Sequence, residues 1–90
     1  MTKLEELISD IEKAEILASE YSGGYSGEFL SVEEFHRSLK DSLENLKNGE
    51  LEDLDNLQLW FSPTGPWDDF IGLDGLVLGN QIFEKLNSLK

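Results

Sequence analysis

Three long segments of the chain place apolar residues at helical spacing, and this pattern limits the fold more than any other feature. The first stripe, in residues 2–21, consists of Leu4, Leu7, Ile8, Ile11, Ala14, Leu17, Ala18 and Tyr21. The second consists of Val32, Phe35, Leu39, Leu43 and Leu46. The third consists of Leu78, Ile82, Leu86 and Leu89, with Leu76 and Phe83 beside it. Residues three and four apart share one face of an α-helix, so each segment buries one side only.

Capping motifs predict where these helices begin. Thr2 and Glu5 have the spacing of a capping box, and so do Ser31 and Glu34. In that motif the two side chains satisfy backbone N–H groups that the first turn leaves free. Asp74 precedes the third stripe, so we expect it to cap a last helix over residues 75–89.

Glycines and a pair of phenylalanines define the link between the first two helices. The first helix is expected to end at residues 22–24, which include two glycines, and the second at Asn48-Gly49, because glycine readily closes a helix. Phe29 or Leu30 is placed to pack back onto Phe35 as a hydrophobic staple.

Residues 50–75 give a mixed signal. The residues that share a helical face are Leu51, Leu54, Leu57 and Phe61. Leu57, Leu59 and Phe61 also alternate with Gln58 and Trp60, as in a short strand. The favoured interpretation is a short helix to about Gln58 followed by an extended stretch, then a helical turn over 66–71 capped by Thr64. The prediction is an all-α fold, a small antiparallel bundle of three to four helices in one domain over residues 1–90, with an irregular Trp/Pro-rich connection before the last helix.

Composition restricts the class of protein. Ninety residues make one domain, and there is no cysteine for disulfides or thiolate metal sites. The first residues lack the apolar core of a signal peptide, and no apolar run approaches the length of a membrane span. A cytoplasmic protein is therefore expected.

The charge is strongly negative and unevenly distributed. The chain carries 19 acidic residues against 7 Lys and Arg, a net charge of −12. Residues 48–84 contain eight acids and no Lys, Arg or His. Such a charge argues against direct binding of nucleic acid or anionic membranes, because phosphate binding needs Lys and Arg. It attracts basic partners.

The stretch from Trp60 to Phe70 concentrates the large aromatic side chains. It contains both tryptophans, both prolines and four of the nine aromatic residues. We expect Phe61 and Phe70 to face the core. Tryptophan is common in binding hot spots. If the indoles are exposed beside acids, this region forms an acid-ringed anchor for a basic protein. Its candidate residues are Trp60, Trp67, Asp53, Asp55, Asp68 and Asp69.

Gly79 interrupts an otherwise regular helix, which costs about 1 kcal/mol relative to alanine. The usual reason for such a glycine is the close approach of a neighbouring group. An indole ring from Trp60 or Trp67 is the candidate.

No pattern in the sequence indicates catalysis or a metal site. His36 is the only histidine, and no neighbouring side chain has the arrangement that activates a nucleophile. Twelve-residue loops counted from Asp53 or Asp68 lack the closing acid of a calcium loop. We expect no enzyme activity, no metal and no cofactor.

Two motifs resemble the immunity proteins of nuclease-type colicins and pyocins. The first is Leu57-Gln58-Leu59-Trp60-Phe61-Ser62-Pro63, an aromatic pair before a proline, and the second is the acidic loop from Asp68 to Gly75. That family consists of small, acidic, cytoplasmic four-helix bacterial proteins with a very short third helix. The resemblance implies that Glu33, Glu34 and Asp41 on the second helix, with Trp60-Phe61, bind and block a nuclease domain.

The leading hypothesis is therefore an immunity or inhibitor protein, a monomer or weak dimer, that neutralises a basic protein such as a nuclease toxin. One alternative is a DNA-mimic regulator of a nucleic-acid-binding protein, which requires spaced carboxylates and buried aromatics. The other is a small-ligand module with a pocket beside Trp67 and His36.

Overall fold

The computed structural model describes residues 2–22, 24, 29–62 and 65–89. These residues form helices and no extended strand, which confirms the predicted all-α class. The elements are α1 (Lys3–Ala18), α2 (Val32–Lys47), α3 (Leu54–Trp60), α4 (Pro66–Phe70), the 3-10 helix η1 (Gly72–Gly75) and α5 (Leu76–Leu89). In this described part, no helix combines the length and the apolar character that a membrane crossing requires.

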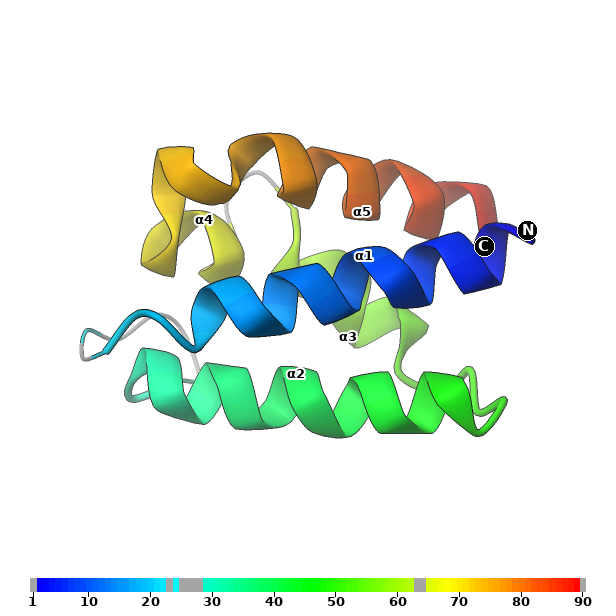
Figure 1. The fold of residues 1–90 in the computed structure, drawn as a ribbon, viewed down its shortest axis with the longest axis horizontal. Coiled ribbons are helices and arrows are strands. Elements are labelled where there is room, and N and C mark those ends of the chain that lie inside the picture. The colour runs from blue at the N-terminus through cyan, green and yellow to red at the C-terminus, as the bar shows by residue number, and fades with distance from the viewer. Residues whose placement is uncertain (1, 23, 25–28, 63–64, 90) are drawn as a thin grey trace.

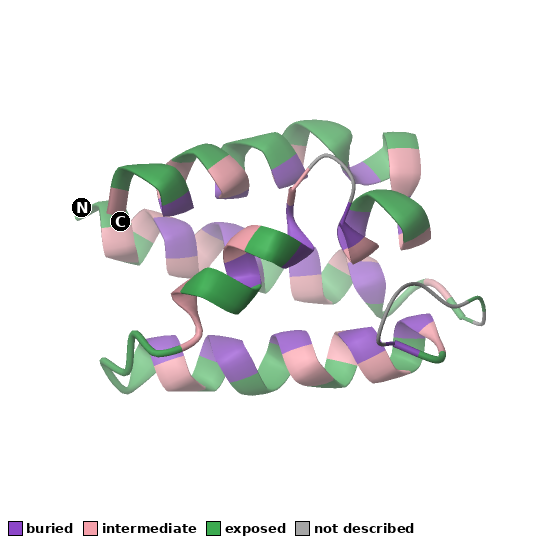
Figure 2. Cartoon of the chain, turned by 180° about the vertical axis from the view of Figure 1, so that it is seen from behind, coloured by how far each residue is buried: buried purple, intermediate pink, exposed green. Residues whose placement is uncertain are grey.

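The three long helices form an antiparallel layer with α1 in the middle. Figure 1 shows α1 running opposite to both α2 and α5, and α1 makes its main contacts with these two helices. Seen from behind, α3 crosses the space between α2 and α5 (Figure 2), and its buried residues are Leu57 and Trp60. The elements α4 and η1 lie together at one end of the molecule, beside the end of α1 and the start of α5 (Figure 1).

The predicted helix starts of α1 and α2 are confirmed. The Thr2 hydroxyl accepts a hydrogen bond from the Glu5 backbone N–H at 3.1 Å, and the Ser31 hydroxyl accepts one from Glu34 at 3.2 Å. Gly49 adopts a φ of +85°, the left-handed conformation that closes α2. The first helix ends at Ala18, before the predicted end at residues 22–24.

The core is built from the predicted stripes. All five stripe residues of α2 are buried. The staple forms through Phe29, whose ring lies 5.2 Å from that of Phe35, whereas Leu30 is 77% exposed. The buried apolar residues of the long helices and of the segment before α2 are Leu7, Ile11, Ala14, Ala18, Phe29, Val32, Phe35, Leu39, Leu43, Leu46, Ile82 and Leu86.

Three local predictions are wrong. The extended stretch after Gln58 does not form, because Leu57 and Trp60 are three residues apart and both become buried when α3 continues to Trp60. Asp74 does not cap α5: it lies within η1, and its carboxylate accepts a hydrogen bond from the Tyr21 hydroxyl at 2.5 Å. The N-cap of α4 is Gly65, and the predicted cap Thr64 lies outside the described residues.

Ion pairs join α1 to both of its neighbours. Lys85 on α5 donates a hydrogen bond to Asp10, whose side chain is only 9% exposed. On the other side, Lys47 of α2 lies 3.9 Å from Glu12, and both of these side chains are about half exposed. A buried carboxylate depends on its cation far more than a solvated one does.

The two pairs predict different responses to removal of the lysine. Replacing Lys85→Met should leave the Asp10 carboxylate buried without its cation and lower the free energy of unfolding by about 1–3 kcal/mol. Lys47→Met is the matched control and should change it by less than about 0.5 kcal/mol. Urea denaturation at pH 7 measures both, and equal effects would contradict the difference in burial.

Candidate protein-binding surface

Trp67 fills a notch made by two glycines. Its side chain is 3% exposed, and the indole N–H donates a hydrogen bond to the Gly75 carbonyl oxygen at 2.8 Å. A Cβ atom on Gly79 would lie 2.6 Å from indole atoms Cδ1 and Nε1, and one on Gly75 would lie 2.5 Å from Cζ2. The predicted close approach at Gly79 is confirmed, and Trp67 is the residue that makes it.

Trp60 is also a core residue. It is 7% exposed and packs edge-to-face against Phe29 and Phe35, with ring centroids 5.5 and 5.9 Å away. Phe61 is buried as predicted, and Phe70 is partly buried, with its ring 5.6 Å from that of Phe35.

The predicted aromatic anchor is therefore not present. Its condition was that Trp60 or Trp67 be exposed beside acids, and both indoles are covered. The physical reason is that α3 and α4 are too short to fill the space beside the long helices with aliphatic residues. Large rings fill it instead, so these two tryptophans are structural and any partner meets other side chains.

The fit of Trp67 predicts an unusual outcome for a helical glycine. Gly79→Ala should gain about 1 kcal/mol of helix propensity. The added methyl group collides with the indole, however, and such overpacking costs about 1–3 kcal/mol or more. The variant should therefore unfold at lower urea concentration than the wild type.

Ser88→Ala on the exposed side of α5 is the control for Gly79→Ala, because it changes propensity without a steric clash. It should unfold at equal or slightly higher urea concentration. A stabilised Gly79→Ala variant would show that Trp67 does not occupy the notch.

The acids predicted around the tryptophans separate into two places. Asp68 and Asp69 are exposed on α4. Asp53 precedes α3 and accepts a hydrogen bond from the Asn45 side chain at 2.8 Å, and Asp55 is exposed in the first turn of α3. Figure 1 places the start of α3 toward the opposite end of the molecule from α4, so the four carboxylates do not form one cluster.

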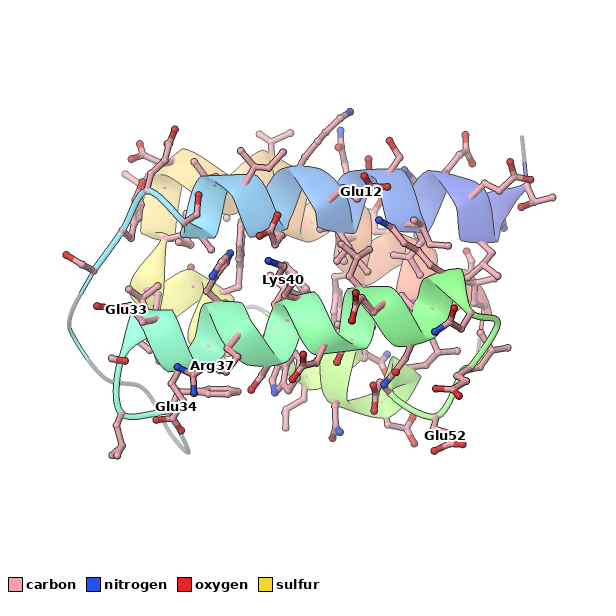
Figure 3. The ribbon with its side chains drawn as sticks, turned by 60° about the horizontal axis from the view of Figure 1, so that its bottom comes forward. Glu12, Glu33, Glu34, Arg37, Lys40 and Glu52 are labelled. Atoms are coloured by element: carbon pink, nitrogen blue, oxygen red, sulfur yellow. The ribbon has the colours of Figure 1, made fainter. Side chains whose placement is uncertain are left out.

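The helix α2 carries charges of both signs. Its acids are Glu33, Glu34, Asp41 and Glu44, and its bases are Arg37, Lys40 and Lys47, a net charge of −1. Figure 3 shows Glu34 and Arg37 on one side of α2 and Lys40 on the side that faces α1. The helix that carries Glu33, Glu34 and Asp41, the acids that the family resemblance implies, is therefore nearly neutral as a whole.

Negative charge accumulates instead at one end of the molecule. The end of α1, the start of α2, α4, η1 and the start of α5 meet there (Figure 1), and we call the described residues of the segments 14–36 and 65–80 the acidic end. These two segments contain no Lys or Arg. The acids among their described residues are Glu15, Glu20, Glu33, Glu34, Asp68, Asp69 and Asp74.

The acidic end also exposes three neighbouring apolar side chains, Leu73, Leu76 and Val77, which we call the apolar patch. Their exposed fractions are 87%, 44% and 70%. Leu76 was expected beside the core. Leu73 and Val77 were not among the predicted site residues. The sequence did contain an indication, because both are apolar and lie outside the stripe of residues that α5 buries.

A small hollow lies beside the apolar patch. Its walls include Phe61, Trp67, Asp68 and Leu76, and its volume is about 10 Å³, the space of about one water molecule. Small-molecule sites are typically tens of times larger. His36 does not line this hollow, and its Nε2 atom lies 2.7 Å from a Glu15 carboxylate oxygen. Within the described residues, no three His, Asp or Glu side chains gather closely enough to hold a metal ion.

Tyr21 links the end of α1 to η1. Its hydroxyl donates to the Asp74 carboxylate, and this hydrogen bond is the main reason that the pKa of Tyr21 is raised above 10.0. Desolvation and the negative charges of Asp74 and Glu20 act in the same direction. A raised pKa in the folded state means that the contact stabilises the fold fully below the unfolded pKa of about 10 and loses this contribution as pH rises through the folded value.

The Tyr21 hydroxyl is expected to ionise at higher pH than a free tyrosine does. In a Tyr25→Phe background, which leaves Tyr21 as the single tyrosine, ultraviolet absorbance should show ionisation above pH 10. Asp74→Ala should return the midpoint toward the value of a free tyrosine, about 10. An unchanged midpoint in Asp74→Ala would rule out the contact in solution.

No protein-family model, curated protein sequence or solved structure matches this chain.

Proposed function

We propose that this chain is a small acidic protein-binding module of immunity or inhibitor type, which binds and neutralises a basic protein such as a nuclease toxin. The observation that carries the proposal is the acidic end, where carboxylates from four helical elements meet in segments without Lys or Arg. The family resemblance in the sequence supports the same class.

The physical basis is the electric field of this end. Carboxylates of one sign attract a basic surface over about a Debye length, roughly 8–10 Å at physiological salt. Such fields accelerate encounter with an oppositely charged protein and disfavour partners of like charge. Asp68 and Asp69 are exposed on α4 and replace the tryptophans as the residues expected to meet the partner.

A DNA-mimic regulator remains the second candidate, and the buried aromatics favour it. That hypothesis required Trp60 and Trp67 to be covered and carboxylates to be presented on the surface, and both tryptophans are buried. The exposed Leu73, Leu76 and Val77 among the acids favour the first candidate. Nucleic acid has no aliphatic side chains, so a protein that mimics it has no need of such a surface. Both candidates bind a basic protein.

The position of the charge, and not its total, should determine binding. Asp68→Asn with Asp69→Asn removes two charges from the acidic end, whereas Glu50→Gln with Glu52→Gln removes two exposed charges from the loop before α3. The immobilised wild-type chain is used to capture a binding protein from the native host, and that protein is purified. Its association rate with each variant is then measured at low and at physiological salt. The α4 variant should associate about tenfold more slowly at low salt, because rim charges act mainly on the association rate.

The loop variant serves as the matched control and should associate at close to the wild-type rate. Circular dichroism verifies that both variants are folded. Equal slowing by the two variants would mean that only net charge matters, and binding without any salt dependence would remove the acidic end as the recognition surface.

A further inference from the structure

We infer that the apolar patch of Leu73, Leu76 and Val77 is the docking point for the basic partner. The partner would present an aliphatic or aromatic side chain flanked by Lys or Arg. This inference rests on the proposed function and names the contact within the acidic end that gives it affinity.

The three side chains contribute little to the core. Leu73 and Val77 are 87% and 70% exposed, and they lie one helical turn apart where η1 continues into α5. Single exposed apolar residues are ordinary on protein surfaces. Three on adjacent turns, beside a hollow bounded by Asp68, form a patch with a fixed shape.

The backbone beneath the patch is held firmly. The Trp67 indole N–H bonds to the Gly75 carbonyl oxygen, directly between Asp74 and Leu76 in the chain. The Tyr21 hydroxyl donates a hydrogen bond to the Asp74 carboxylate, which fixes the residue before Gly75. A surface held in place before binding loses less conformational entropy in the complex, so its contacts yield more affinity.

Charge complementarity identifies the occupant. Asp68 lies beside Leu76, Asp74 is next to Leu73 in the chain, and residues 48–84 contain no Lys, Arg or His. An apolar centre with a charged rim is the usual anatomy of a protein–protein interface. Lys and Arg suit this site because their aliphatic stems cover apolar surface while their charged groups reach the rim. A second copy of this chain, with a net charge of −12, would bring the same carboxylates to the same rim.

The test uses the full ¹⁵N-labelled chain and defined peptides as probes. A helical Lys/Leu peptide is compared with a Lys/Ser peptide of equal charge and a Glu/Leu peptide of equal apolar content. The Lys/Leu peptide should bind most tightly, with the largest amide shift changes at residues 68 and 72–77. Leu73→Ser with Val77→Ser should weaken its binding about tenfold, because two apolar contacts are lost.

The matched control is Leu51→Ser with Leu59→Ser, since these leucines are 50% and 63% exposed outside the acidic end. Its affinity should equal that of the wild type. Equal binding of the Lys/Leu and Lys/Ser peptides, or no effect of the patch variant, would overturn the docking inference and leave the acidic end as a purely electrostatic site.

Two further outcomes are decisive. If neither basic peptide binds better than the Glu/Leu peptide at low salt, the proposed function fails as well. Sedimentation velocity of the free chain tests whether a second copy of this chain occupies the apolar patch. A dimer that forms with rising concentration and is lost in the Leu73→Ser, Val77→Ser variant would assign the patch to a second copy and overturn the inference.

Discussion

The packing of Trp67 into the notch of Gly75 and Gly79 is the contact on which the second half of this fold depends. A helix of five residues, such as α4, has little stability of its own. The indole attaches it to α5 by a buried hydrogen bond to Gly75 and by close contact at Gly79, and its ring lies 5.0 Å from that of Phe61. The positions of Asp68, Asp69 and the apolar patch all follow from this one contact.

The same contact explains how a residue type common in binding sites serves a structural role here. Tryptophan offers a large apolar surface and one N–H donor that needs a partner when buried. Trp67 has that partner in the Gly75 carbonyl oxygen, and Trp60 lies among Phe29 and Phe35. The aromatic concentration between residues 60 and 70 therefore builds the connection between α3 and α5, and the exposed Asp68 and Asp69 lie beside it.

Sequence periodicity was sufficient for the long helices and insufficient for the site. The stripes and caps of α1 and α2 were predictable because burial on a regular helix repeats every three to four residues. Gly79 was informative because glycine inside a helix requires a steric reason. The burial of Trp60 and Trp67 was not predictable, because short helices and turns contain too few residues for hydrophobic periodicity to show which face is buried. The acidic end was not predictable either, since it combines the end of α1 and the start of α2 with α4 and η1, which come together only after folding.

The separation of charge along the molecule has a consequence for how the protein meets a partner. The start of α1 and the end of α2, which carry Lys3 and Lys47, lie at the end opposite α4 (Figure 1), whereas residues 14–36 and 65–80 contain no Lys or Arg. Under the proposed function, this uneven distribution of charge would turn the α4 end toward a basic partner before contact. Mutual orientation normally limits association far below the collision rate. Lysines far from the proposed binding surface would then contribute to recognition without touching the partner.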